Sequence, residues 1–285
     1  MGLYATLAEL KAVMNSDAVA QDAKLLSALR VASRRVDMEM GSKRAYFEPV
    51  LEVRAVPVRA TTTAQYGRNL RLPFPLLAYT SAVVFGSQTP TEQTAISNGA
   101  IYPYGAAPAW ELTITGASNG WYIAPDTFAL ITGVWGYHRD YANAWVSVDT
   151  LAAAIVSTTA TSLTVADVDG VDEYGQTPRL STGNLIKVDS EYLEITATNT
   201  TTNVVTVRRG QNGSTAATHL IAAPVSVWRP EDMIRRAVAR QAGLMVARQG
   251  AYTTVSVEAT GTEVRYPVDL LVELRAALQE FSYGV

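Results

Sequence analysis

The sequence contains no cysteine among its 285 residues, which excludes disulfide bonds, thiolate zinc sites, iron–sulfur clusters and cysteine nucleophiles. It contains only two histidines, His138 and His219, about eighty residues apart. No apolar run approaches the roughly 18 residues that a membrane helix needs, and the N-terminus lacks a basic segment followed by an apolar stretch. We therefore expect no membrane insertion and no secretion, and a reducing compartment such as a bacterial cytoplasm.

A surplus of basic residues is also missing, because 23 Lys and Arg face 26 Asp and Glu, for a formal charge of -3. A protein whose main task is to bind nucleic-acid phosphates needs such a surplus. We therefore expect at most passive contact with DNA. With 48% hydrophobic residues, the chain can fill a conventional core in one large or two modest domains.

The N-terminal part has the pattern of two helices. Thr6 and Glu9 have the spacing of a capping box, which predicts a short helix over residues 6–14. A longer helix is predicted over residues 20–40, with Leu25, Leu29, Val36 and Met40 on one face, and Gly41 is its expected end.

Residues 45–148 alternate between apolar and polar side chains, which is typical of β-strands. Pro57, Pro73 and Pro75 favour edge strands or irregular connections there, because proline cannot donate a ladder hydrogen bond. From about residue 147 to 228 the sequence becomes rich in Thr, Ala and Val, with short strand-like runs spaced as in a small barrel or sandwich. We interpret this second stretch as a separate inserted module.

Helical patterns return after Trp228. Pro230 suits the first turn of a helix that Gly250 ends, and a hairpin is predicted over residues 255–266. A final helix is predicted from Pro267 or Val268 to about Phe281. The predicted fold class is therefore α+β. The expected domains are a helical body with a small β region, residues 1–146 plus 229–285, and an inserted all-β domain, residues 147–228.

Two patterns that could support catalysis or metal binding have simpler explanations. Residues 116–120 fit G-x-S-x-G, and a hydrolase using Ser118 and His138 is conceivable, but an extended segment follows where that motif needs a helix. Asp167, Asp169, Asp172 and Glu173 could hold calcium, but the complete EF-hand pattern is absent and we favour a solvated acidic turn. Nucleotide-binding glycine loops are absent from the sequence. We predict no enzyme activity, no cofactor and no metal.

Two helical features favour an interface instead. Arginines of the first C-terminal helix either form a solvated face or meet acidic groups of a neighbouring subunit. The apolar stripe of the last helix either packs on the N-terminal helices or anchors a partner in a groove. The candidate interface residues are Arg235, Arg236, Arg240, Leu270, Leu271, Leu274, Leu278, Phe281 and Tyr283.

Several segments in this order resemble the head-tail connector (adaptor) proteins of long-tailed bacteriophages. They are LAELKAVM with the long helix, LRLPFPLLAYTSAVVFG, ITGVWGY and PEDMIRRAVARQAGLMVARQG. The segments GNLIKVDSEYLEIT and VVTVRRGQNGSTAATH resemble a β module that recurs in phage virion proteins, in which Gly210 and Gly213 would permit tight turns and Asn212 a left-handed conformation. A minimal adaptor lacks this inserted module.

The resemblance implies a structural virion protein that is made in the host cytoplasm and placed in the neck. It would form a ring of expected twelvefold symmetry between the portal and the next neck protein, a stopper or tail terminator. The ring would line the channel through which DNA passes without sequence-specific binding, and residues 266–285 would dock on the portal. The alternative is a virion recognition protein that binds host glycan or the capsid through residues 102–145 and the β module.

Overall fold

The computed structural model describes most of the chain, and its contacts divide the chain into two compact units. The first unit comprises Met1–Arg44, Trp145–Gln211 and Thr215–Val285, and the second comprises Ala45–Ala144 and Asn212–Ser214. The described residues are 2–15, 19–41, 46–57, 66–67, 69–85, 93–95, 100–103, 107–115, 121–122, 128–172, 175, 177–249 and 272–281.

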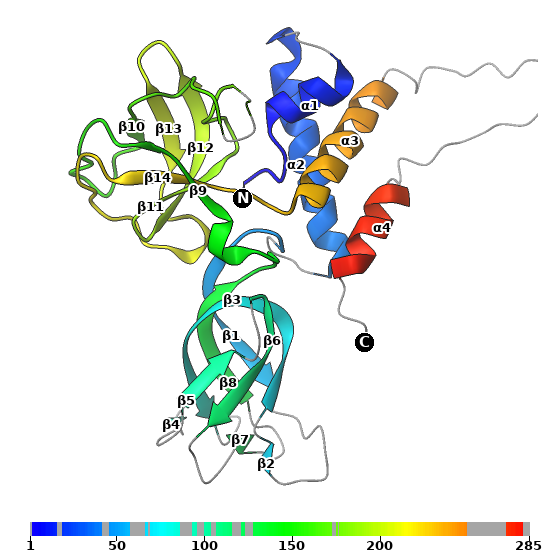
Figure 1. Ribbon diagram of the computed structural model, residues 1–285, viewed down its shortest axis with the longest axis vertical. Helices are drawn as coiled ribbons and strands as arrows, with labels where there is room; N and C mark the ends of the chain where they lie inside the picture. The colour runs from blue at the N-terminus through cyan, green and yellow to red at the C-terminus, as the bar shows by residue number, and fades with distance from the viewer. Residues whose placement is uncertain are drawn as a thin grey trace, which may run out of the picture. The chain divides into compact units, whose positions relative to one another are not determined.

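The helices belong to the first unit (Figure 1). They are α1 (Leu7–Met14), α2 (Asp22–Glu39), α3 (Asp232–Gln249) and α4 (Val272–Phe281), with a short 3-10 turn at Val19–Gln21. The predicted capping box is confirmed: the Thr6 Oγ1 atom accepts a hydrogen bond from the Glu9 N–H at 3.1 Å, and Glu9 Oε2 accepts one from the Thr6 N–H at 2.7 Å. No helix in the described ranges is long and apolar enough to cross a membrane.

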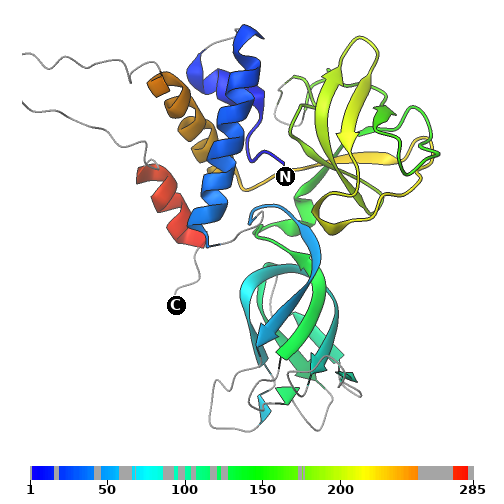
Figure 2. The same ribbon diagram turned by 180° about the vertical axis from the view of Figure 1, so that it is seen from behind.

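α3 is the centre of the helical bundle, because it packs against α1, α2 and α4 (Figures 1 and 2). The predicted stripe of α2 is buried at Leu25, Leu29 and Val36, and α3 buries Ile234 and Val238. Because the apolar positions recur every three or four residues, each helix presents one continuous apolar face to its neighbours. Helices from opposite ends of the sequence therefore share one core.

Residues 145–228 form a six-stranded antiparallel sheet, which we call the barrel. Its order is β10-β13-β12-β11-β14-β9. A bridge between Leu151, after β9, and Val165, after β10, brings the two edge strands together. The apolar core of the barrel includes Ile186, Leu193 and Val227. The strands are β9 (Trp145–Thr150), β10 (Ser162–Thr164), β11 (Leu185–Val188), β12 (Glu191–Asn199), β13 (Val204–Arg208) and β14 (Pro224–Trp228).

The N-terminal segment joins the barrel to the helices within the first unit. The Leu3 N–H donates to the Gly183 carbonyl of the barrel at 2.9 Å, and the Tyr4 N–H donates to Ser33 Oγ of α2 at 3.1 Å. The Tyr4 hydroxyl also donates to Asp37, and the Leu3 and Tyr4 side chains are buried. The predicted division at residues 147 and 228 remains a prediction.

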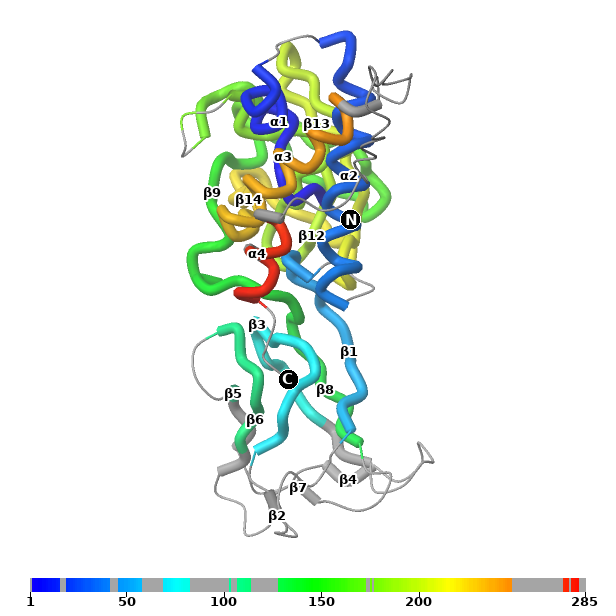
Figure 3. The backbone as a smooth tube through the Cα atoms, turned by 90° about the vertical axis from the view of Figure 1, so that its right-hand side faces the viewer, coloured from blue at the N-terminus to red at the C-terminus, as the bar shows by residue number. Residues whose placement is uncertain are grey.

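The second unit contains the other six-stranded antiparallel sheet, of order β1-β8-β3-β6-β5, with β4 pairing with β3, and a small β2-β7 pair. β1 and β8 run side by side over eight residue pairs (Figure 3). The elements are β1 (Val50–Pro57), β2 (Tyr66–Gly67), β3 (Asn69–Phe85), β4 (Gln93–Ala95), β5 (Ala100–Pro103), β6 (Ala109–Thr115), β7 (Trp121–Tyr122), β8 (Phe128–Trp135) and a 3-10 turn at Tyr141–Asn143.

Pro57 ends the edge strand β1, as expected, whereas β3 corrects the expectation for the other two prolines. Pro73 and Pro75 lie within this long strand, which pairs with both β6 and β8. They fall where the register with β6 shifts between Arg71 and Leu76, and pairing with β8 begins only at Leu76. The strand therefore continues through both prolines because no ladder hydrogen bond is required from them at this irregularity.

The predicted fold class is wrong. The molecule is mostly β, with two antiparallel sheets and few helices in the described ranges, whereas a helical body with a small β region was expected. The first β stretch builds a full sheet with its own apolar core, in which Leu112, Ile131 and Trp135 are fully buried. Prolines and glycines split its alternation into short runs, so the sequence pattern underestimates the length of the strands.

Candidate interface on the helices and the barrel

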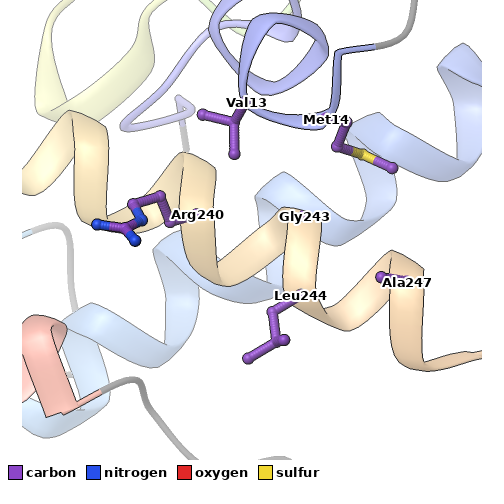
Figure 4. Close-up of a pocket in the computed structure, with 6 residues that line it drawn as sticks. All are labelled: Val13, Met14, Arg240, Gly243, Leu244 and Ala247. Carbon is purple, nitrogen blue, oxygen red and sulfur yellow. The ribbon is translucent and has the colours of Figure 1, made fainter.

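A groove runs between α1 and α3, and we call it the helix groove (Figure 4). It consists of two adjoining hollows of about 360 and 480 Å³ that share Val13 and Arg240. Val13 and Met14 of α1 lie beside Gly243 of α3, where an added Cβ atom would be 3.6 Å from Val13 Cγ1 and 3.5 Å from Met14 Cγ. The lining residues are Glu9, Ala12, Val13, Met14, Asp232, Arg235, Arg236, Ala239, Arg240, Gly243, Leu244 and Ala247.

The three predicted arginines of α3 line one hollow of this groove but differ in their surroundings. Arg235 is buried, and its Nε donates to Glu9 Oε1 at 3.0 Å while Nη1 donates to Asp232 Oδ1 at 3.0 Å. Arg235 therefore joins α1 to α3 inside the chain. Arg236 and Arg240 are exposed, so their guanidinium groups can be reached by a partner.

The predicted apolar stripe of the last helix is partly accounted for. Leu274, Leu278 and Phe281 are 0%, 5% and 2% exposed, and α4 packs against α3. In this structure they are core residues of the bundle, which is one of the two expected alternatives. Leu270, Leu271 and Tyr283 lie outside the described residues. Docking of this segment on a partner remains a prediction.

A buried polar network in the barrel was not expected from the sequence. Glu191 is fully buried, and its two carboxylate oxygens accept hydrogen bonds from Arg209 Nε and Nη2, both at 2.7 Å. The Gly210 and Ala217 N–H groups also donate to this carboxylate, each at 3.0 Å. His219 lies with Nε2 2.8 Å from Glu191 and Nδ1 2.7 Å from Asp189. The network holds the loop after β13 against the β11–β12 hairpin.

Opposing effects act on the pKa of Glu191. Burial raises the pKa, because it removes water from the ionised carboxylate. The hydrogen bonds from Arg209, from the Ala217 N–H, from His219 and from the Gly210 N–H together outweigh burial and lower the pKa from 4.5 to about 2. Glu191 is therefore ionised at neutral pH, and its charge is matched by the buried guanidinium of Arg209.

The backbone of the resembling motif behaves as its residue types predict. Gly210, Asn212 and Gly213 have φ values of 59°, 50° and 82°, so each has the left-handed conformation expected of them. His219 lies in a loop but is only 3% exposed. The sequence places Arg209 and His219 in one motif and Glu191 in the hairpin before it. Sequence reasoning did not predict that these three side chains meet.

The acidic loop before β11 is closed by arginines. Asp167 Oδ2 lies 3.0 Å from Arg179, and Asp172 Oδ2 lies 3.0 Å from Arg229. Within the described part of the chain, no group of three or more histidine and carboxylate side chains is arranged to hold a metal ion. Glu173 lies outside the described residues. Two of the predicted calcium ligands are thus already paired with guanidinium groups.

Only some residues of the two alternative functions lie within the described ranges. Ser118 of the hydrolase hypothesis lies outside the described residues, and His138 Nδ1 accepts a hydrogen bond from the Asp140 N–H at 3.1 Å. In the aromatic stretch expected to bind glycan, Trp135 and Tyr137 are buried, and Tyr137 packs against Tyr46 and Phe47. Trp135 and Tyr137 thus serve the core of the second unit.

No protein-family model, no curated protein and no solved structure matches this chain. The assignment of function rests on its own residues. The described surface offers a cationic groove between two helices, and the buried charges of Glu191 and Arg235 are paired within the chain. This arrangement suits binding of another protein surface better than it suits chemistry on a small substrate.

Proposed function

We propose that this chain is a structural subunit of a phage virion, a head-tail adaptor that forms a ring between the portal and the next neck protein. The supporting observation is the helical bundle. α1 and α2 precede the two sheets in the sequence, α3 and α4 follow them, and all four meet around α3. This arrangement agrees with the resemblance, which implies a ring subunit built from an N-terminal helix pair and late helices.

The surface of the bundle supports association with other proteins. Arg236 and Arg240 are exposed beside the groove, and Val13 and Met233 are 49% and 42% exposed. An exposed apolar residue next to arginines is typical of protein interfaces, where arginine pairs with carboxylates and apolar side chains exclude water. The ring would leave DNA to pass without sequence-specific contacts.

Reconstitution with the portal protein of the same virion tests the proposal. The purified chain is mixed with portal rings, and the product is examined by native mass spectrometry and electron microscopy. We expect a second ring with the symmetry of the portal, twelvefold for a twelvefold portal. A chain that stays unbound at concentrations of tens of micromolar, while the portal remains intact, would contradict it.

Docking through the last helix needs a test that separates binding from folding. Deletion of α4 removes Leu274, Leu278 and Phe281 from the core, so loss of binding after deletion would be ambiguous. Arg275 and Glu280 are exposed on the same helix. We expect the variant Arg275→Glu/Glu280→Arg to bind the portal at least about tenfold more weakly at an unchanged melting temperature. Unchanged portal affinity would reject docking through this face.

A further inference from the structure

The barrel has an exposed apolar patch on two neighbouring loops. Val156, Leu220 and Ile221 are 85%, 79% and 63% exposed, the highest exposures among the large hydrophobic side chains of the barrel. A bridge pairs Ile155 with His219, and both of these side chains are buried. Because successive side chains of paired extended segments alternate between faces, Val156 and Leu220 point away from the core. We call these three residues the loop patch.

The loop patch and the helix groove lie at two ends of the first unit. β14 begins at Pro224, next to the loop that carries Leu220 and Ile221, and ends at Trp228, four residues before α3 begins. The strand thus leads from the patch end of the barrel to its helix end, as Figure 1 shows. One unit therefore presents a protruding apolar patch at one end and an apolar groove at the other.

The charges around the two surfaces are complementary. The groove is lined by three arginines and two carboxylates, and α3 carries four arginines and one aspartate. Residues 145–228 contain eight acidic and four basic residues, a net charge of -4. The side chain of Asp189 is 57% exposed, so the barrel presents a solvent-accessible carboxylate. Arg236 and Arg240 of a second molecule could meet it.

We infer that the loop patch of one copy docks in the helix groove of the next copy. Leu220 and Val156 cover the apolar wall formed by Val13 and Met14, while the acidic barrel faces the arginines of α3. The two surfaces differ, so the contact is head-to-tail, and its repetition closes into a ring when the rotation between neighbours is right. This inference rests on the proposed function, because it names the surfaces by which ring subunits associate.

Cross-linking tests the contact, and the absence of cysteine makes introduced thiols the only ones present. In the variant Val13→Cys/Leu220→Cys, a short thiol-specific cross-linker should give a ladder of multimers. A mixture of the two single variants should give dimers and nothing larger, because each copy then has one reactive surface. Val13 is 49% exposed and Leu220 is 79% exposed, so the cross-linker can reach both introduced thiols. Unchanged melting temperatures would establish that the variants fold.

A matched control uses Val31→Cys with Leu220→Cys, since Val31 is 53% exposed on α2 and does not line the groove. A Val13–Leu220 yield no higher than the Val31–Leu220 yield overturns the inference. A second readout is the variant Leu220→Lys/Ile221→Lys, which removes the apolar contact and places positive charge opposite the arginines of α3, so it should raise the dissociation constant for self-association about tenfold or more. Self-association as strong as in the wild type would likewise overturn it.

The outcomes separate this inference from the proposed function. Rings that form on the portal without a Val13–Leu220 cross-link above the control reject the patch-in-groove contact and leave the adaptor role standing. A cross-linked ladder from a chain that does not bind the portal supports the contact and rejects the adaptor role. Cross-linked dimers that form in the mixture, but not with either single variant alone, further show that the contact is head-to-tail.

Discussion

The barrel and the sheet of the second unit each contain six strands, but they fix their loops in different ways. In the barrel, the loop after β13 is held by the buried charges of Glu191 and Arg209. In the second unit, the segment after β8 is held by an aromatic contact and a backbone hydrogen bond. Tyr137 stacks on Tyr46 with the ring centroids 6.0 Å apart, and the Tyr137 N–H donates to the Tyr46 carbonyl at 2.8 Å.

This difference determines how each region should respond to change. A buried ion pair is costly to break, because the remaining charge stays in a poorly solvated place. The contact between Tyr46 and Tyr137 gains a charge only if a tyrosine hydroxyl ionises, and burial raises the pKa of Tyr46 well above its ordinary value of 10.0. The barrel loop should therefore be sensitive to loss of one charge and to acid, and the second sheet to changes of side-chain volume.

The largest effect is expected for Arg209→Ala, which leaves Glu191 buried without its cation. We expect a loss of about 3–5 kcal/mol in the free energy of unfolding of the barrel. Arg179→Ala is the control, because it leaves behind Asp167, whose side chain is 42% exposed and stays solvated, which predicts a loss of about 1 kcal/mol. Urea denaturation followed by region-resolved hydrogen exchange measures both. Equal losses would refute the comparison.

The next effect is the acid dependence of the barrel. Glu191 has a pKa of about 2 in the folded chain against an ordinary value of 4.5, so folding favours its ionised form. Its contribution to stability is complete above about pH 4.5 and is lost as the pH falls towards 2. The shift corresponds to about 3 kcal/mol.

Melting temperatures at a series of pH values between 6 and about 2 test this sign in wild type and in Glu191→Gln. The glutamine cannot ionise, so the variant should be less stable at neutral pH and should lose less on acidification. Parallel curves for the two proteins would show that Glu191 does not control the acid response.

An intermediate effect is expected for Gly133→Ala in β8. A Cβ atom there would lie 2.5 Å from the Ala78 carbonyl oxygen and 2.8 Å from Leu76 Cδ1, so the central strands must move apart. We expect a loss of about 1–3 kcal/mol in the second unit. In the control Gly243→Ala on α3, the nearest atoms are 3.5 Å away, so the same change should be neutral or stabilise the helix by up to about 1 kcal/mol. Similar destabilisation by both would contradict this argument.

Sequence reasoning was most accurate where the signal is local. The capping box at Thr6 and the end of α2 just before Gly41 depend on residues within a few positions of one another, and both are confirmed. The strands of the barrel were also recognisable, because turn residues separate short apolar runs.

What the sequence could not predict depends on long-range contacts. β3 tolerates Pro73 and Pro75 because pairing changes at that point, which cannot be known without its neighbours β6 and β8. Arg235 and Glu9 are 226 positions apart, so their pairing depends on the packing of α3 on α1. Arg235, Arg236 and Arg240 share one helix, but only the fold shows that the first is internal and the others are exposed.

The smallest effects come from two cations placed over aromatic rings, one in each sheet. Arg54 of β1 lies 4.7 Å from the Phe74 ring and 4.9 Å from the Trp135 ring, and it pairs with Glu52. Lys187 of β11 lies 5.1 Å from the Trp145 ring. Arg54→Met should cost about 1 kcal/mol, because a cation–π contact and an ion pair are lost.

Lys187→Met should be neutral or slightly stabilising at neutral pH. Burial lowers the pKa of Lys187 from 10.5, so the folded barrel disfavours its charge, whereas methionine fills similar space without one. Burial destabilises the charged lysine at pH values below its folded-state pKa. This cost disappears once the pH exceeds 10.5, where the lysine is neutral in the unfolded chain as well, so the gain in stability from Lys187→Met should disappear there too. Denaturation of both variants at pH 7 and at pH above 10.5 measures this. A loss for Lys187→Met as large as that for Arg54→Met would mean that the cation over Trp145 stabilises the barrel despite its burial.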